Sequence, residues 1–372
     1  MIRRLLIGAA ALASAFAPAV AARPVTDCPN RDAPFSADAP VIDLLLSPAA
    51  RAVLEREMGP LGGGGSARFF STTPPTFAAI LTLKETSRFS GMKPERIAAL
   101  DVELRQLPVT AADRVARCTR YDNEVPVFDL PAGKRPRVLL FEKINGFKDE
   151  PSVNAANAAV RAMAERKGWA VAVTDKGGAI NPRTLRQFDV VIWNNISGDV
   201  LTLSQRAALR RWLDRGGGFV AMHGSAGDFV YWWDWYPDRL IGARFIGHPM
   251  NPQFQEARVV TNTAHPLATG LPAEWRMTDE WYSFRTNPRA VGANVLLTLD
   301  ESSYKPVGTM GQDIRMGKDH PIAWTNCIGR GRTFYSAIGH MPETYVEPNH
   351  VRLLETAITW AASEKRACPA GK

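Results

Sequence analysis

The sequence lacks several features that identify whole classes of protein. It has no run of five or more Lys and Arg residues, and its net charge of +8 is modest for 372 residues, so we do not expect a nucleic-acid partner. Its 4 cysteines include no C-x-x-C pair, which argues against a thiolate metal site or a redox motif. After residue 22 there is no apolar run of the roughly 20 residues that a spanning helix needs. What remains is ordinary globular composition, 45% hydrophobic and 22% charged.

The first residues have the three parts of a secretory signal peptide. Arg3 and Arg4 precede an apolar run from Leu5 to Val20, and Ala19-Val20-Ala21 supplies small residues for cleavage. We therefore expect residues 1–22 to be removed. The mature protein, with a charge of 8 − 2 = +6, is then expected to be periplasmic or secreted, without a stable membrane anchor.

An oxidising compartment would favour disulfides. The four cysteines allow three pairings. Cys28–Cys118 would tie the N-terminal part together, and Cys327–Cys368 would tie the C-terminus to the core.

Residues 23–124 are predicted to form a small, mostly helical module. Apolar residues recur at helical spacing in Val41–Met58 and Pro94–Leu107, and the glycine-rich segment Gly59–Ser66 interrupts them. Residues 125–136 contain prolines and a lone glycine, which is typical of a linker.

The pattern changes at residue 137, where short apolar runs begin to alternate with helical segments. We predict helices at Ser152–Lys167, from Thr202 to Arg215 and at Val351–Ser363. This alternation favours an α/β fold over residues 137–363, a parallel sheet with helices on both faces, followed by a tail at 364–372. The predicted strands are Val138–Phe141, Ala170–Val173, Asp189–Trp193, Phe219–Met222, Arg258–Thr261, Val295–Leu299, Ile322–Trp324 and Thr333–Ser336.

Polar residues gather where the predicted strands end. His223 follows the strand that ends at Met222, at a strand-to-helix turn, and ligands of such sheets bind outside the carboxyl ends of the strands. His248, His265 and His320 each precede a proline, which places them in extended or turn backbone. Together with the carboxylates of Asp279-Glu280, such histidines could bind a metal or act as general acid and base.

An unusual run of aromatic residues follows His223. Six of the eight residues from Phe229 to Tyr236 are aromatic. Flat apolar faces with a polar edge suit the C–H faces of sugar rings, but plain packing explains such a run equally well.

Six ordered segments follow one another between Arg137 and about Ser363. They are Gly216–Gly224, Gly247–Gln253, His265–Pro272, Asp279–Phe284, Leu297–Tyr304 and His320–His340. Together they make this part of the chain resemble a ThuA-like (trehalose utilisation) domain. That resemblance implies a flavodoxin-like sheet similar to class I glutamine amidotransferases, and a role in the catabolism of disaccharides or keto-sugars.

Two positions depart from the relatives. The strand-to-helix elbow that presents a nucleophilic Cys in amidotransferases carries His223 here, so glutamine hydrolysis through a thioester has no nucleophile. Phe147-Lys148-Asp149-Glu150 stands where many relatives have an Arg-His-Asp run.

The favoured hypothesis is an enzyme acting on a disaccharide or a 3-keto-glycoside. Its alternatives are a carbohydrate-binding protein without catalysis, and a serine esterase using Ser225, whose G-x-S-x-G motif is broken by His223. The small-molecule site is predicted to contain catalytic His223, Asp279, Glu280 and His340, substrate-binding Asp228, Tyr231, Trp233, Trp281 and Tyr282, and a divalent metal such as Zn²⁺ on His223, His248 and His340.

Overall fold

The computed structural model describes residues 24–59, 69–363 and 368. The predicted signal peptide, most of the glycine-rich segment and most of the C-terminal tail lie outside these residues. Within them, no helix has both the length and the apolar character needed to cross a membrane.

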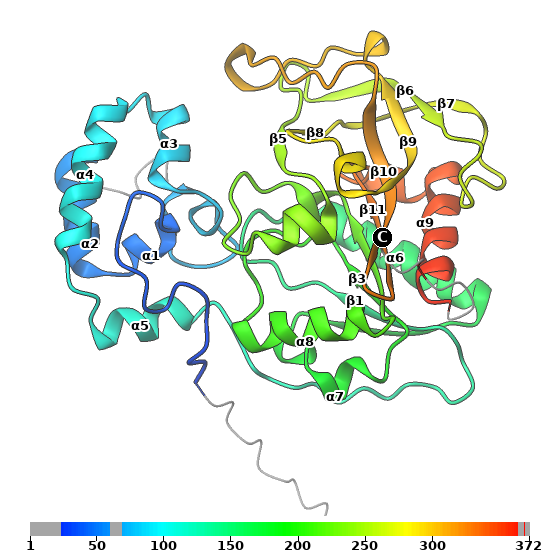
Figure 1. The fold of residues 1–372 in the computed structure, drawn as a ribbon, viewed down its shortest axis with the longest axis horizontal. Helices are drawn as coiled ribbons and strands as arrows, with labels where there is room; N and C mark the ends of the chain where they lie inside the picture. Colours follow the sequence, from blue (N-terminus) through cyan, green and yellow to red (C-terminus); the bar gives the residue numbers. More distant parts are fainter. Residues whose placement is uncertain (1–23, 60–68, 364–367, 369–372) are drawn as a thin grey trace, which may run out of the picture.

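The N-terminal module forms a helical body beside the larger domain, at the left of Figure 1. The predicted helix over 41–58 is two helices, because Pro48 cannot continue the first one and instead begins the second. Phe35, Leu44, Leu54 and Leu104 form part of a separate apolar core of this module. Its described α-helices are α1 (Val41–Leu45), α2 (Pro48–Met58), α3 (Leu83–Ser90), α4 (Pro94–Gln106) and α5 (Ala111–Cys118).

The larger domain is built on a nine-stranded sheet in the order β2-β1-β3-β4-β11-β10-β9-β6-β7. The pairs from β2 to β11 are parallel, which confirms the predicted α/β fold. The strands are β1 (Arg137–Phe141), β2 (Ala170–Thr174), β3 (Val190–Trp193), β4 (Gly218–Met222), β6 (Phe254–Thr261), β7 (Glu274–Glu280), β9 (Asn294–Asp300), β10 (His320–Ile328) and β11 (Gly331–Ser336), with β5 (Phe245–Gly247) and β8 (Ser283–Phe284) as a separate pair.

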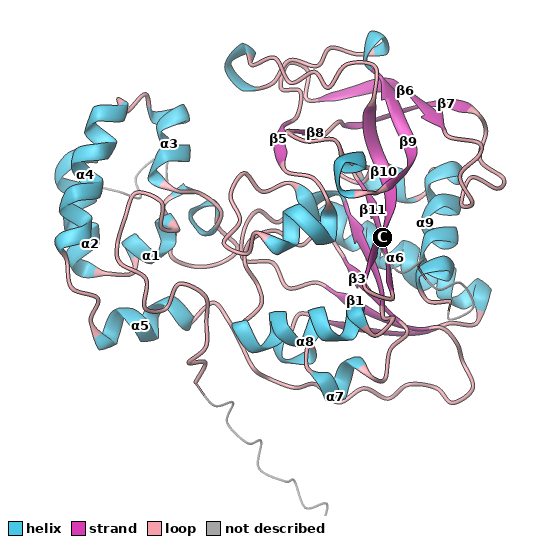
Figure 2. Cartoon of the chain, in the orientation of Figure 1, coloured by secondary structure: helices cyan, strands magenta, loops and turns pink. Residues whose placement is uncertain are grey.

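Helices cover the parallel half of the sheet (Figures 1 and 2). Helix α6 (Glu150–Lys167) packs beside α9 (Pro348–Ala361), and α7 (Pro182–Leu185) packs beside α8 (Leu203–Asp214). The predicted capping box of α8 is present, since Thr202 accepts from the backbone N–H of Gln205 and the Gln205 side chain bonds back.

The other half of the sheet is antiparallel from β11 to β7. Apolar runs alone do not reveal strand direction, so the sequence did not predict that this half of the sheet is antiparallel. The connection between β10 and β11 is only Gly329-Arg330, which permits a hairpin, whereas a parallel pair needs a long crossover.

Two disulfides are present, Cys28–Cys118 and Cys327–Cys368. The first joins the start of the described chain to the end of α5. The second joins β10 to the C-terminal segment. These are the two pairs considered from the sequence.

Candidate functional site

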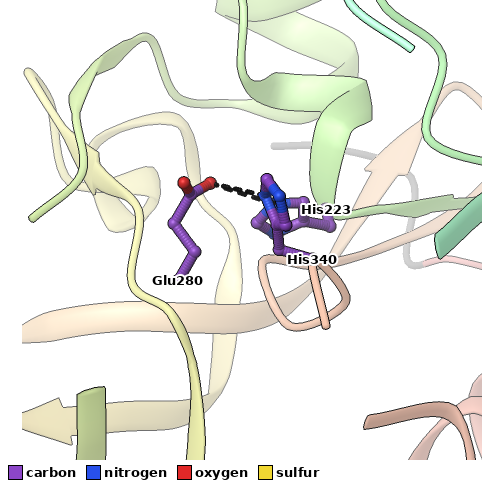
Figure 3. Close-up of side chains that lie close together, drawn as sticks. All are labelled: His223, Glu280 and His340. Carbon is purple, nitrogen blue, oxygen red and sulfur yellow. Dashed lines mark hydrogen bonds and ion pairs between the residues drawn. The ribbon is translucent and has the colours of Figure 1, made fainter. Parts of the chain in front are cut away.

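Three side chains from distant parts of the chain meet at one point (Figure 3). His223 follows β4, Glu280 is the last residue of β7, and His340 lies in the loop after β11. The His223 Nε2 atom lies 3.3 Å from Glu280 Oε2 and 3.3 Å from His340 Nδ1, while His340 Nδ1 lies 2.9 Å from Glu280 Oε2. We call these three residues the triad.

The backbone at His223 directs its imidazole towards the other two residues. Its φ of 28° is rare for a residue other than glycine. Its carbonyl accepts the Tyr335 hydroxyl at 3.0 Å, and its Nδ1 lies 2.7 Å from the Ala337 carbonyl oxygen. Because a carbonyl can only accept, Nδ1 carries a proton towards Ala337, and Nε2 is the ring atom that faces Glu280 and His340.

Gly339 permits His340 to approach His223. Its φ is +138°, and a Cβ at this position would lie 2.3 Å from the Tyr345 hydroxyl and 3.2 Å from His223 Cβ. A larger residue would therefore force the 339–341 loop away from the triad.

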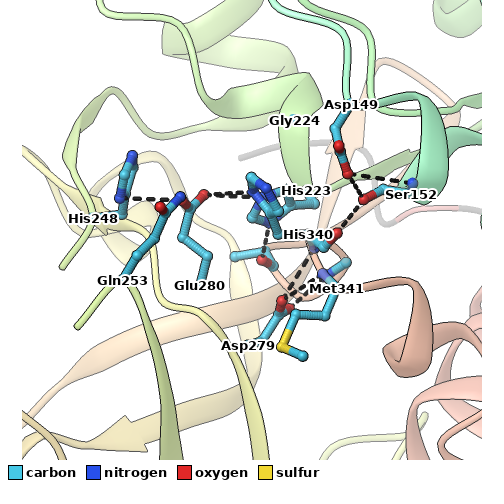
Figure 4. A network of polar contacts seen from close by, with 12 residues as sticks. Asp149, Ser152, His223, Gly224, His248, Gln253, Asp279, Glu280, His340 and Met341 are labelled. Carbon is cyan, nitrogen blue, oxygen red and sulfur yellow. Dashed lines mark hydrogen bonds and ion pairs between the residues drawn. The ribbon is translucent and has the colours of Figure 1, made fainter. Parts of the chain in front are cut away.

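Asp279 holds this loop by its backbone (Figure 4). Its carboxylate accepts N–H groups from Gly339 at 2.6 Å, Met341 at 3.0 Å and His340 at 3.1 Å. Burial raises the pKa of Asp279, although the nearby His223 and the backbone N–H groups oppose the shift. The sequence predicted Asp279 as a catalytic acid or base. In the structure its oxygens face the backbone of the 339–341 loop, and Asp279 does not line the cavity next to the triad.

Glu280 points the opposite way from its neighbour, as successive residues of a strand do. Its Oε1 accepts from Gln253 Nε2 and lies 3.1 Å from His248 Nδ1. Burial alone would raise the Glu280 pKa, but hydrogen bonds from His223 and His340 and the charge of His248 hold it far below its usual range. Burial lowers the His340 pKa, but its hydrogen bond and charge interaction with Glu280 outweigh that effect and raise it.

The triad has the donor set and spacing of a metal site. Its three donor atoms all lie within 4.8 Å of one another. A tetrahedral Zn²⁺ site with bonds of about 2.0–2.1 Å has ligand atoms about 3.3 Å apart, close to the three separations above. Two imidazoles and one carboxylate also suit other divalent metals. The sequence predicted His248 as the third ligand beside His223 and His340. In the structure Glu280 occupies that position through Oε2, and His248 contacts the other carboxylate oxygen, Oε1.

The triad borders a cavity of about 380 Å³, a volume typical of small-molecule sites. The α/β domain and the N-terminal module both contribute to its wall, and His223 lies behind Tyr282 at its edge, with the two ring centroids 4.1 Å apart. The lining residues are Phe69, Phe77, Ile80, Leu81, Phe147, Ser197, Gly224, Gly227, Asp228, Phe229, Phe245, His248, Met250, Gln253, Glu280, Tyr282, Thr309 and His340.

The predicted sugar-binding residues separate into two groups. Tyr282 and Asp228 line the cavity. Burial raises the pKa of Asp228 to about 7, against the opposing hydrogen bonds from Ser197 and Gly198. Trp281, by contrast, is fully buried and donates its indole N–H to the Gln255 carbonyl at 2.8 Å. Its ring cannot stack on a substrate.

The aromatic run after His223 is used for packing. Tyr231 and Trp233 border a separate small cavity of about 20 Å³, and Trp233 stacks on Trp235 with ring centroids 5.1 Å apart. The Arg206 guanidinium lies 5.1 Å from the Trp233 ring centroid. Of this run only Phe229 lines the large cavity.

Ser225 is not arranged as a nucleophile. Its hydroxyl donates to the Trp193 carbonyl and accepts from the Ile196 N–H, both at 3.1 Å, and the residue is only 1% exposed. An esterase would also need a histidine base, but His320 faces Glu301 at 2.8 Å and the Tyr282 carbonyl at 2.9 Å. The structure does not assemble the esterase triad.

Several residues of the cavity wall carry no signal in the sequence that marks them as functional. Gln253 lies within one of the ThuA-like segments, but nothing in the sequence sets it apart as a site residue. Phe147, in the segment that departs from the relatives, and Phe245 also line the cavity. In the sequence each stands without another aromatic residue next to it. Phe69 and Phe77 come from a module in which nothing suggested chemistry. No local pattern distinguishes such residues from core residues.

The family is identified by comparison with known sequences. The ThuA family, described as trehalose utilisation, matches residues 137–361. The chain belongs to this family. No curated protein matches the chain.

Two solved structures of ThuA-like proteins are similar to this chain. One from Bacteroides uniformis ATCC 8492 is 25% identical with a TM-score of 0.53, and the match covers 64% of this chain and 95% of that one. Another, from Parabacteroides merdae ATCC 43184, is 18% identical with a TM-score of 0.47, covering 62% of this chain and 91% of that one. The N-terminal module lies outside the family match.

Proposed function

We propose that this ThuA family member is an exported enzyme that acts on a disaccharide or a 3-keto-glycoside, with a divalent metal bound by the triad. The observation that carries the proposal is the convergence of His223 Nε2, Glu280 Oε2 and His340 Nδ1 beside a cavity of small-molecule size. The family description, trehalose utilisation, supports a carbohydrate substrate. The two disulfides are compatible with export.

Each residue around the triad has a defined task in this proposal. A divalent ion bound there would polarise a substrate carbonyl or lower the pKa of a bound water. Gln253 and His248 hold Glu280 Oε1, so that Oε2 faces the two histidines. Ala337 fixes the His223 tautomer and Asp279 positions His340.

His248 is the proposed acid–base group. It lines the cavity, its side chain is 23% exposed, and only its Nδ1 is engaged by Glu280 and the Pro249 carbonyl. It can therefore reach both a substrate hydroxyl and the buried carboxylate.

The first test is metal content. The purified protein is expected to contain about one equivalent of a divalent metal by inductively coupled plasma mass spectrometry, and His223→Ala or His340→Ala should lose it. His265→Gln is the matched control, because this buried histidine bonds Thr325 and the Leu267 N–H and lines no part of the cavity. Triad variants that fold and keep the metal would contradict the site.

The second test is turnover. Wild-type protein is assayed by product analysis on trehalose, other disaccharides and their 3-keto derivatives, with the triad variants beside it. Activity that disappears with the metal and returns when metal is restored to wild type is expected. No turnover of any of these substrates by metal-loaded protein would contradict the proposal.

A further inference from the structure

Three phenylalanine rings extend from the N-terminal module to the triad. The Phe69 and Phe77 ring centroids are 5.3 Å apart, and Phe77 and Phe147 are also 5.3 Å apart. Phe147 then lies 6.3 Å from the His340 ring. Because Phe147 is 41% exposed and lines the cavity, this series forms an accessible apolar wall that ends at a proposed metal ligand.

A second aromatic wall ends at the other histidine of the triad. Phe229 and Phe245 have ring centroids 5.1 Å apart, and Phe245 and Tyr282 are 4.6 Å apart. Tyr282 in turn lies against His223. The two walls therefore border one space, with Glu280 and His340 of the triad at one end and mostly apolar side chains along the walls.

Much of the polar capacity of the lining is already used within the protein. The Asp228 oxygens accept from the Ser197 hydroxyl at 2.6 Å and the Gly198 N–H at 2.7 Å. Gln253 donates to Glu280. A second sugar ring in the apolar part would leave its hydroxyls without partners, which is costly in a desolvated site.

The module side of the cavity consists of Phe69, Phe77, Ile80 and Leu81, which we call the roof. The roof is attached to the α/β domain, since the Thr76 N–H donates to the Asn145 carbonyl at 3.0 Å and the Trp232 indole donates to the Asp38 carbonyl at 3.3 Å. A Cβ on Gly146 would lie 2.5 Å from Ile80 Cγ2. This close approach makes the roof a built part of the site.

We propose that the substrate is a glycoside with a flat, apolar non-sugar group, and that the roof selects it. The sugar ring occupies the end of the cavity at Glu280 and His248, and an aromatic aglycone lies against the apolar wall formed by Phe69, Phe77 and Phe147. This inference rests on the proposed function for the position of the sugar. The roof residues precede the family match at 137–361, so this selectivity belongs to the module and not to the shared domain.

The test is a binding measurement that needs no turnover. Isothermal titration calorimetry on the full mature protein compares the phenyl and methyl 1-thioglucosides, in both anomers, with trehalose. The S-glycosidic analogues resist cleavage. We expect the phenyl compound to bind at least about tenfold more tightly than the methyl compound in one anomeric series, and more tightly than trehalose.

Single substitutions then locate the preference. Phe69→Ala and Phe77→Ala should bring the phenyl-to-methyl affinity ratio close to one. Phe70→Ala is the matched control, because this neighbouring ring packs on the module core and does not line the cavity. Phe77→Leu, which keeps apolar volume, and a melting curve for every variant separate lost stacking from lost folding.

Several results would overturn the inference. These are equal affinity for phenyl and methyl compounds, tighter binding of trehalose, no binding of any glucoside, or a phenyl preference that persists in both Phe→Ala variants. Failure of the proposed function is seen separately, as protein that contains no triad-bound metal and turns over no sugar, whatever its affinity ratio.

Discussion

The triad and the roof border the same cavity but are built from opposite chemistry. The triad belongs to the α/β domain, where a strained turn, a buried carboxylate and backbone carbonyls direct three polar side chains to one point. The roof belongs to the N-terminal module and contributes only apolar side chains. In the proposed function, reaction chemistry and substrate choice therefore belong to separate parts of one chain. The following experiments each perturb one of these parts.

Glu280→Gln should have the largest effect on the triad. An amide is a poor metal ligand, so we expect loss of the metal and a fall in kcat of about 10³-fold or more. Steady-state kinetics and metal analysis provide the measurement. Glu274→Gln, at the exposed start of the same strand, should match wild type. A Glu280→Gln protein that retains both metal and turnover would remove Glu280 from the site.

Asp279→Asn should weaken the triad indirectly. An asparagine has one acceptor oxygen for three backbone N–H groups and places an amide donor against them, which costs about 3 kcal/mol of unfolding free energy. Displacement of His340 should also reduce metal affinity by about tenfold or more. Chemical denaturation and metal titration test this, with exposed Asp313→Asn as control. Unchanged stability and affinity would show that the loop does not depend on Asp279.

Acid should destabilise the α/β domain through His350, because this histidine is fully buried there. Burial lowers the pKa of His350 to about 4 from 6.5. The unfolded chain therefore binds a proton that the folded protein does not, and stability present above pH 6.5 is lost as pH falls towards 4. His350 should account for up to about 3 kcal/mol of that loss.

The measurement is urea denaturation of wild type and His350→Gln at several pH values from 7.5 to 4.5. The variant should show a shallower loss, because glutamine does not titrate. Parallel curves for the two proteins would exclude His350 as a source of the acid sensitivity.

Removal of the Cys28–Cys118 disulfide should affect the roof and not the triad. The double variant Cys28→Ser/Cys118→Ser frees a chain segment of 90 residues, and we expect a loss of about 2–3 kcal/mol of module stability. Metal stoichiometry should stay at the wild-type value while proteolysis within the module becomes faster. Cys327→Ser/Cys368→Ser, which releases only the C-terminal segment, is the control. Loss of metal in the first variant alone would show that the triad depends on the module.

Much of the architecture followed from local patterns. The apolar runs predicted the parallel strands, because strands buried on both faces require them, and the capping sequence at Thr202 predicted the start of α8. The direction of β9 and β10 did not follow, since it depends on which strands pair. The dense aromatic run suggested sugar stacking, but Trp233 packs beside Arg206 and Tyr231 beside Tyr236, while scattered phenylalanines line the cavity.

By itself, the sequence determined the elements, the family and the polar residues near strand ends, because these depend on periodicity and short motifs. Only the tertiary structure decided that Glu280, and not His248, completes the triad, that Asp279 faces backbone, and that Phe69 and Phe77 reach the cavity. The physical reason is that neighbouring strand residues point to opposite sides. In addition, contacts such as His223–His340, 117 positions apart, exist only after the chain has folded.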